Sequence, residues 1–239
     1  QWKVTMENQG FAASPVYVDG VVYAVSTNFS NGSGTLIAFD AASGNQLWSA
    51  SGIGDTQAGS PIVYDDLVII GSAVNPIIKA FNKTSGELVW ETDNGSTMVN
   101  SGAVSGNGYL FVADLSSNLH VYDVFTGDRL HTYQLKNIST TGVAITEGQV
   151  VVGDHSGVSS FEAPGMLSGT VTGSNGEPVK AKITIVETGK STEADENGVF
   201  SLSSPPGKYK VKVAYYGLKQ VVETVTFVSG YQVKKDFEL

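Results

Sequence analysis

Cysteine is absent from this sequence of 239 residues, and charged side chains are scarce. Without cysteine the chain has no disulfide, no thiolate-bound metal and no cysteine nucleophile. Charged residues make up 15% of the chain, against about 25% in an average globular protein. No apolar run approaches the roughly 18 residues that a membrane-spanning helix requires. Hydrophobic residues still amount to 41% of the chain, which is enough for a packed core and excludes an intrinsically disordered protein.

The few charges are unevenly distributed along the chain. The formal net charge of −9 argues against nucleic acid as a partner, because binding of phosphates requires clustered Lys and Arg. Residues 1–166 carry five basic and fifteen acidic side chains, whereas residues 167–239 carry nine basic and eight acidic ones. This shift predicts two domains, 1–166 and 167–239. The sequence opens on Gln1 rather than Met, so we expect a processed or truncated product.

A repeat of about 40 residues occupies the first of these domains. Four hairpin-like segments begin 46, 41 and 40 residues apart, at Ser14, Ser60, Ser101 and Thr141. Each consists of two short β-branched or aromatic runs around a turn. Asp19-Gly20 and Asn107-Gly108 are suited to two-residue turns, because Gly and Asn adopt positive φ at low cost.

A second element follows each hairpin and completes the repeat. It comprises a third apolar run, a Gly-containing turn and a fourth run that ends in Trp at residues 36–48 and 78–90. The third copy, residues 119–131, ends in His131, and the fourth stops near residue 165. Four short strands per repeat cannot bury both faces of one sheet, so this pattern predicts sheets stacked radially in a β-propeller.

The second element resembles the tryptophan-docking motif of pyrroloquinoline-quinone-type propeller repeats, Ala-x-Asp-x-x-Ser/Thr-Gly-x-x-x-Trp. The matching residues are Ala38, Asp40, Gly44 and Trp48, then Ala80, Gly86 and Trp90 with Asn82 in the Asp position, then Asp123, Thr126 and Gly127 with His131 in place of Trp. The resemblance covers residues 1–163 and implies that each Trp packs between neighbouring blades. Quinone-binding members of the family need a larger ring, a metal ion and usually a vicinal cysteine pair, so we expect no cofactor here.

The number of blades is left open by the sequence. About four are visible, and the last lacks its outer strand. Trp2 lies 12 residues before Ser14, as Trp48 lies 12 before Ser60, so residues 1–5 have the character of an outer strand. Either this strand pairs with residues 158–161 and closes a four-bladed ring, or the repeats are part of a larger propeller whose other blades lie upstream or on another chain.

The second domain has the pattern of a small β-sandwich. Lys208, Lys210 and Lys212 alternate with apolar residues, as on a strand with one solvated face. The Gly-x-Val, Gly-x-Pro, Asp-x-x-Gly-x-Phe and Pro-Gly-x-Tyr-x-Val motifs at residues 169–171, 176–178, 195–200 and 206–211 resemble the carboxypeptidase regulatory-like domain, a transthyretin-like sandwich. That resemblance implies a non-catalytic accessory module of secreted and cell-surface proteins.

No catalytic or metal-binding constellation emerges from the sequence. Gly153-Asp154-His155-Ser156-Gly157 contains the residue types of a hydrolytic triad, but neighbours on a strand point to opposite faces, so we expect a turn. The three histidines lack short ligand spacing; we expect His120 to be half-buried in a strand and leave His131 and His155 without a role. Residues 195–198 superficially resemble a calcium loop without its final acidic ligand.

Five Asn-x-Ser/Thr sites are candidate glycan acceptors: Asn28, Asn31, Asn82, Asn94 and Asn137.

Taken together, these features predict an extracellular or cell-surface all-β protein without catalytic residues. Its propeller would be a docking platform and its sandwich a spacer or assembly module. We expect a protein partner or self-assembly. The alternative is an extracellular propeller hydrolase, or the C-terminal part of a larger surface enzyme, to which scattered acids such as Asp65, Asp66, Asp114 and Asp154 would contribute.

Overall fold

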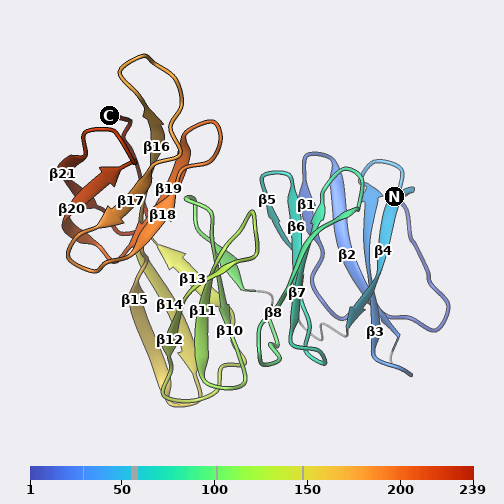
Figure 1. The fold of residues 1–239 in the computed structure, drawn as a ribbon. Helices are drawn as coiled ribbons and strands as arrows, with labels where there is room; N and C mark the ends of the chain where they lie inside the picture. The colour runs from blue at the N-terminus through green and yellow to red at the C-terminus, as the bar shows by residue number, and fades with distance from the viewer. Residues whose placement is uncertain (29, 55–58, 101, 147) are drawn as a thin grey trace. The chain divides into compact units, whose positions relative to one another are not determined.

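A computed structural model describes residues 1–28, 30–54, 59–100, 102–146 and 148–239, in which every regular element is a β-strand (Figure 1). The predicted all-β class is therefore confirmed. Ser101 and Glu147, which belong to the third and fourth repeats of the sequence, lie outside the described residues. The contacts divide the chain into two units, residues 1–145 with 151–159 and residues 146–150 with 160–239.

The first unit is built from sheets whose strands follow one another in sequence. Three sheets have four antiparallel strands each, in the orders β1-β2-β3-β4, β5-β6-β7-β8 and β12-β11-β10-β9. A further sheet, β13-β14-β15, has three, and the division between the units runs through its strands. The bounds are β1 (Val16–Val18), β2 (Val21–Asn28), β3 (Ser33–Asp40), β4 (Gln46–Gly54), β5 (Ile62–Tyr64), β6 (Leu67–Gly71), β7 (Ile77–Asn82), β8 (Leu88–Asp93), β9 (Ala103–Val104), β10 (Tyr109–Ala113), β11 (Asn118–Asp123), β12 (Arg129–Gln134), β13 (Val143–Thr146), β14 (Gln149–Asp154) and β15 (Gly157–Glu162).

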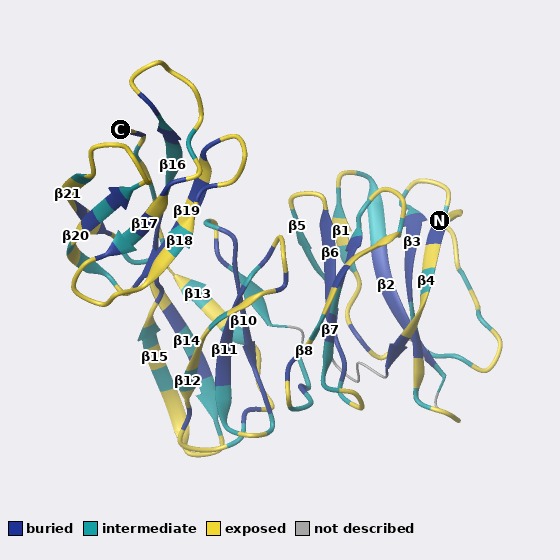
Figure 2. Cartoon of the chain, viewed as in Figure 1, coloured by how far each residue is buried: buried dark blue, intermediate teal, exposed yellow. Residues whose placement is uncertain are grey.

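The second strands of the two middle repeats are buried along their whole length. Every residue of β6 and of β10 is buried, and the third strands β7 and β11 are nearly so, whereas the outer strands β4, β8 and β12 are largely exposed (Figure 2). Continuous apolar runs such as Leu67–Ile70 are typical of strands covered on both faces. One apolar cluster joins the first two sheets through Leu36, Val68 and Phe81, and another joins the second and third through Ile69, Leu110 and Tyr122.

The hairpin turns differ between repeats. Asp19 and Gly20 have φ of 50° and 84°, as a two-residue type I′ turn requires. The expected two-residue turn at Asn107-Gly108 is wrong, because β9 ends at Val104 and β10 begins at Tyr109. The loop between them has four residues, 105–108, and is closed by a 3.0 Å hydrogen bond from the Gly108 amide to the Ser105 carbonyl.

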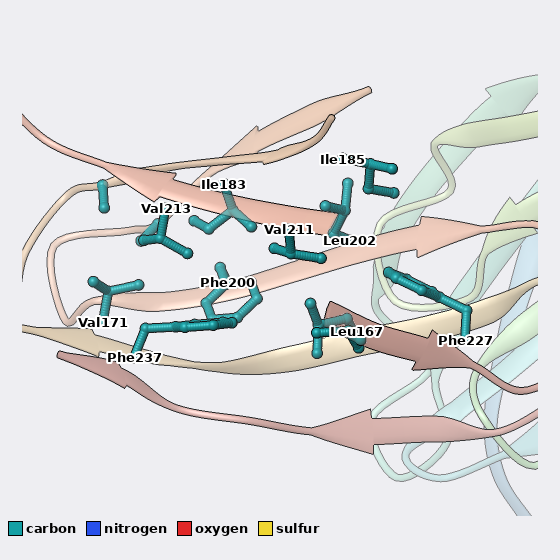
Figure 3. Packing of buried hydrophobic residues seen from close by; sticks show 13 residues of the cluster. Leu167, Val171, Ile183, Ile185, Phe200, Leu202, Val211, Val213, Phe227 and Phe237 are labelled. Atoms are coloured by element: carbon teal, nitrogen blue, oxygen red, sulfur yellow. The ribbon is translucent and has the colours of Figure 1, made fainter. Parts of the chain in front are cut away.

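The second unit contains two facing sheets. One has the order β19-β16-β22, with β23 also pairing with β16, and the other has the order β18-β17-β20-β21. Figure 3 shows their buried side chains, among them Leu167, Ile183 and Val211, in a single core. The bounds are β16 (Gly165–Thr172), β17 (Lys182–Ile185), β18 (Ser191–Glu193), β19 (Val199–Ser204), β20 (Gly207–Ala214), β21 (Val221–Phe227), β22 (Gln232–Lys234) and β23 (Phe237–Glu238).

Candidate functional site

Each tryptophan of the first unit packs on a glycine turn of the repeat that follows it. Trp48 Nε1 donates a 3.0 Å hydrogen bond to the Lys83 carbonyl, and a Cβ added to Gly86 would lie 2.6 Å from the Trp48 ring. Trp90 stands in the same relation to the Val124 carbonyl, at 3.0 Å, and to Gly127, at 2.6 Å. Only a residue without a side chain allows the indole to approach this closely.

A small residue lies directly across from each of these indoles. Ala38 pairs with Trp48 and Ala80 with Trp90, and in both sheets the register shifts immediately after the alanine. The bulge leaves one residue of the outer strand unpaired and turns that strand locally. In the third sheet Val121 and His131 occupy these positions, and His131 packs edge-on against Tyr133 with ring centroids 4.5 Å apart.

The Asp or Asn of the motif closes the turn that receives the indole. Asp40 Oδ1 accepts hydrogen bonds from the amide and hydroxyl of Ser43, at 2.7 and 2.6 Å, and these bonds hold the pKa of Asp40 below its usual value. Asn82 Oδ1 accepts the amides of Thr84 and Ser85 in the same way, which explains why Asn can replace Asp. Asp123 serves the third turn through the Phe125 and Thr126 amides.

Trp2 makes the same contact at the beginning of the chain. Its Nε1 donates a 2.9 Å hydrogen bond to the Ala41 carbonyl, and a Cβ on Gly44 would lie 2.6 Å from its ring. Val4 and Met6 pack with it against the cluster that contains Phe39. The alternating side chains of residues 2–6 thus cover the first sheet as an outer strand of a preceding blade would.

Closure of the ring by this segment is not observed. No strand is assigned among residues 1–15, and β15 is the last strand of its sheet in the part of the chain that the structure describes. Val158, at the start of β15, is 77% exposed. The three-stranded sheet thus has an open edge of the kind that accepts a further strand.

A buried polar cluster in the third sheet was not expected from the sequence. His120 is 3% exposed rather than half-buried; its Nε2 lies 3.1 Å from Asp114 Oδ2 and its Nδ1 lies 2.8 Å from Thr132 Oγ1. Asp114 also accepts the Ser116 and Asn118 amides. Burial by itself raises the pKa of Asp114, but the bonds from His120, Asn118 and Ser116 outweigh it and the pKa is lowered. The order Asp-His-Thr invites comparison with a hydrolytic relay, yet the Asp114 carboxylate mainly fixes the β10–β11 turn.

The neighbouring Asp-His-Ser segment forms a turn, as its position in the repeat indicates. Asp154 Oδ1 accepts hydrogen bonds from the hydroxyl and the amide of Ser156, and these bonds lower the pKa of Asp154. Its Oδ2 accepts the amides of Lys136 and Asn137. His155 Nε2 lies 3.2 Å from Thr140 Oγ1 and takes no part in the Asp–Ser contact. Asp195 likewise closes the β18–β19 turn by accepting the amides of Asn197 and Val199.

The remaining acids of the sequence prediction are not gathered into one site. Asp65, with φ of 50°, and Asp66 form the β5–β6 turn, and Asp66 Oδ1 lies 3.4 Å from Lys83 Nζ. Among the described residues no group of three His, Cys, Asp or Glu side chains is placed to hold a metal ion. A cavity of about 240 Å³ beside Trp48 is lined by Asp19, Tyr23 and Lys83 together with apolar side chains.

The five candidate glycan acceptors differ in exposure. Asn31 and Asn137 are exposed, whereas Asn28 and Asn82 are partly buried; Phe29, inside the first of these motifs, lies outside the described residues. Asn94 is 1% exposed; its Nδ2 donates to the Ser96 carbonyl and its Oδ1 accepts the Tyr122 hydroxyl at 2.6 Å. A glycan on Asn94 is incompatible with this fold, so Asn94 is removed from the candidates.

The described part of the chain contains no helix long and apolar enough to cross a membrane.

Two family models match the sequence. Residues 1–76 and 74–172 match the model described as outer membrane protein assembly factor BamB, and residues 166–239 match the carboxypeptidase regulatory-like domain.

Curated relatives carry two kinds of name. The outer membrane protein assembly factor BamB of Francisella tularensis is 30% identical over 103 residues, which are 43% of this chain and 22% of that protein. The tetrathionate hydrolase of Acidithiobacillus ferrooxidans is 28% identical over 160 residues, covering 55% of this chain and 31% of that enzyme. The chain thus spans about a fifth to a third of the curated relatives it matches.

Solved structures show the likeness of fold. The crystal structure of BamB from Moraxella catarrhalis superposes with a TM-score of 0.53 at 13% identity, covering 93% of this chain and 76% of that one. The computationally designed Ika4 protein gives a TM-score of 0.51 at 14% identity, covering 67% of this chain and 95% of that one.

Proposed function

This chain belongs over residues 1–172 to the propeller-repeat family described as outer membrane protein assembly factor BamB and over residues 166–239 to the carboxypeptidase regulatory-like domains, and we propose on that basis that it is a non-enzymatic docking protein of the cell envelope or cell surface. Its propeller repeats serve as the docking platform for a protein partner, and its sandwich serves as a spacer or assembly module. The domain boundary predicted at residues 166 and 167 belongs to this proposal.

One observation carries the proposal most directly. Among the described residues, the sheet β13-β14-β15 has three strands where each of the three preceding sheets has four, and β15 ends it. At the other end of the repeats, residues 2–6 lie on the first sheet as the outer strand of a preceding blade. A blade that is one strand short offers an interface, and strand addition at such an edge supplies backbone hydrogen bonds to a partner.

The engagement of the acidic side chains also favours a structural role. Asp40, Asp114 and Asp154 all direct carboxylate oxygens at backbone amides of their own turns, and the pKa of each is lowered. A carboxylate that accepts several hydrogen bonds is held in the charged form and is a poor proton donor near neutral pH. These acids therefore stabilise turns, and we assign them no catalytic step.

Cross-linking can test the strand-addition interface, because the chain has no native cysteine. A variant carrying Thr5→Cys and Val158→Cys is oxidised at micromolar concentration and separated by denaturing electrophoresis. Covalent dimers and longer species support self-assembly through the open edge. A monomer with an internal cross-link contradicts a partner at this edge, because the chain then closes its own ring. If no disulfide forms, the edge is tested for a different partner protein. A photo-cross-linking residue is placed at position 158 of the protein in intact cells, and the protein that it captures is identified.

The similarity to tetrathionate hydrolase supports a second candidate function. In that alternative the repeats form part of an extracellular hydrolase whose active site is built from loops of the propeller, with the chain contributing about a third of the enzyme's length. Incubation of the purified chain with tetrathionate tests whether this part of such an enzyme is active by itself. Turnover by the chain alone would replace the docking proposal with the enzymatic one.

A further inference from the structure

One face of the sandwich carries a row of lysines without ion pairs. Lys208, Lys210 and Lys212 alternate along β20 with Tyr209 and Val211, which pack in the core, so the three lysines share the opposite face of the strand. Residues two apart on a strand are separated by about 7 Å. Among the described residues, the lysines in ion pairs lie elsewhere, at positions 79, 83, 180 and 235.

Hydroxyl side chains lie directly across from each lysine. In the register of β20 with β21, Lys208 pairs with Thr226 and Lys210 with Thr224; in its register with β17, Lys212 pairs with Thr184. Directly opposed residues on one face have Cβ atoms about 5 Å apart. The face therefore presents ammonium and hydroxyl groups side by side along the strand, and we call these six residues the lysine–threonine row.

The charges around the row favour an anionic ligand. Residues 205–222 contain four lysines and no acidic residue, in a chain whose net charge is −9. Lys182 adds a further positive charge on β17, beside Glu193 of β18. Glu187 is the other acid next to the row, and both of its carboxylate oxygens accept the Lys210 backbone amide at 3.0 Å. The ammonium groups outnumber the carboxylates that face them.

An exposed aromatic turn continues the row at the end of β20. Tyr216 is 98% exposed and Tyr215 47% exposed. The turn is fixed by a 3.2 Å hydrogen bond from the Leu218 amide to the Tyr215 carbonyl and by Gly217 at φ of 83°. The turn thus presents two exposed aromatic rings, whose faces are available for stacking.

We propose that the lysine–threonine row and Tyr216 bind an acidic polysaccharide. The row is extended and has no enclosing walls, so it fits a linear polyanion better than a small anion. The lysines pair with carboxylate groups of the polymer, the threonine hydroxyls bond to sugar hydroxyls, and the ring of Tyr216 stacks on a sugar face. The site lies on the sandwich alone, and it stands or fails independently of the partner assigned to the propeller repeats.

Binding is measured by interferometry of the full chain against immobilised polygalacturonate at low ionic strength. The variant K208Q/K210Q/K212Q is compared with K3Q/K136Q/K234Q, which removes the same charge from three exposed lysines outside the row. A surface ion pair contributes about two- to five-fold in affinity, so the row variant loses about ten- to a hundred-fold and the control loses little. Tyr216→Ser loses a further three- to ten-fold or so. Added salt weakens the wild-type complex.

Three results would overturn the proposal. The first is no binding of polygalacturonate by the wild-type chain at low ionic strength. The second is an equal loss in the row variant and the control variant, which shows diffuse electrostatics rather than a site. The third is tighter binding of duplex DNA, or of vesicles containing phosphatidylglycerol, than of polygalacturonate, which reassigns the face to another partner. Circular dichroism confirms that the variants fold, as is expected for substitutions on a solvent-facing surface.

Discussion

Replacing Gly86 by alanine is expected to disrupt the packing between the first two sheets of the repeats. The added Cβ would lie 2.6 Å from the ring of Trp48, which is 9% exposed and anchored by its hydrogen bond to Lys83. Overpacking of a filled site costs about 1–3 kcal/mol. The φ of 74° at Gly86 adds about 1–2 kcal/mol for a residue with a side chain. The total is about 2–5 kcal/mol in the free energy of unfolding.

Gly52 provides a matched control for the backbone contribution. Its φ is 75°, and no atom lies within 4 Å of the position that its Cβ would occupy. Gly52→Ala therefore pays only the conformational cost of about 1–2 kcal/mol. The difference between the two variants isolates the contact with Trp48. Gly127→Ala should match Gly86→Ala, whereas Gly44→Ala should cost less, because Trp2 is 38% exposed and can move away.

The four variants are compared by denaturant unfolding followed through tryptophan fluorescence and near-ultraviolet circular dichroism. We expect the order of destabilisation to be Gly86→Ala and Gly127→Ala first, then Gly44→Ala, then Gly52→Ala. If Gly86→Ala costs no more than Gly52→Ala, the contact of Trp48 with Gly86 does not hold the first two sheets together, and the interpretation of Trp48 as a blade-packing residue is refuted. A change in the denaturant slope would instead indicate a change in exposed surface on unfolding.

Three further predictions concern buried groups. The pKa of Asp114 in the folded state is lowered from 3.8, so its ionised form stabilises the fold above that pH, and this stabilisation is lost as the pH falls through the folded pKa. Asp114→Asn should therefore lower the free energy of unfolding by about 1–3 kcal/mol at pH 7. It should also flatten the acid limb of a profile of melting temperature against pH. Tyr122→Phe leaves the buried Asn94 oxygen without its donor and should cost about 1–3 kcal/mol by urea unfolding. Gly169→Ala places a Cβ 2.0 Å from the Lys235 carbonyl and should cost about 3 kcal/mol in the sandwich, while proton spectra of the Trp side chains stay unchanged.

The repeat architecture was predictable because its signals are local. A two-residue alternation, a Gly turn and a Trp at fixed spacing identify a blade, since the indole of Trp48 needs a glycine on the next repeat and a small residue such as Ala38 across from it. The two family models confirm the propeller repeats and the sandwich, and the likeness of fold to BamB agrees with the repeats. The loop at residues 105–108 was missed because Asn-Gly also suits longer loops, where the hydrogen bond spans Ser105 and Gly108.

Contacts between residues distant in the sequence could not be predicted in the same way. The bond of Tyr122 to Asn94 joins β11 to the segment that follows β8. Nothing in the motif Asn94-Gly95-Ser96 distinguishes this buried asparagine from an exposed glycan acceptor. Likewise, His120 stands in a strand pattern that fits either face, and the sequence does not show that its ring meets Asp114 and Thr132. A repeat alignment places such residues on a strand, but only the packing of neighbouring strands decides what they meet.

The charge asymmetry of the chain has a structural origin in the turns. A propeller blade needs a tight turn after its third strand. Asp40 closes that turn by accepting the amide and hydroxyl of Ser43, and Asp123 by accepting the amides of Phe125 and Thr126. Asp114 and Asp154 do the same after the second strand. Where the turn residue is Asp, as in the first and third repeats, the turn adds negative charge; the second repeat uses the neutral Asn82 instead. The sandwich closes its turns with fewer acidic residues. Lys208, Lys210 and Lys212 lie along β20, so positive charge is concentrated on one face of that sheet.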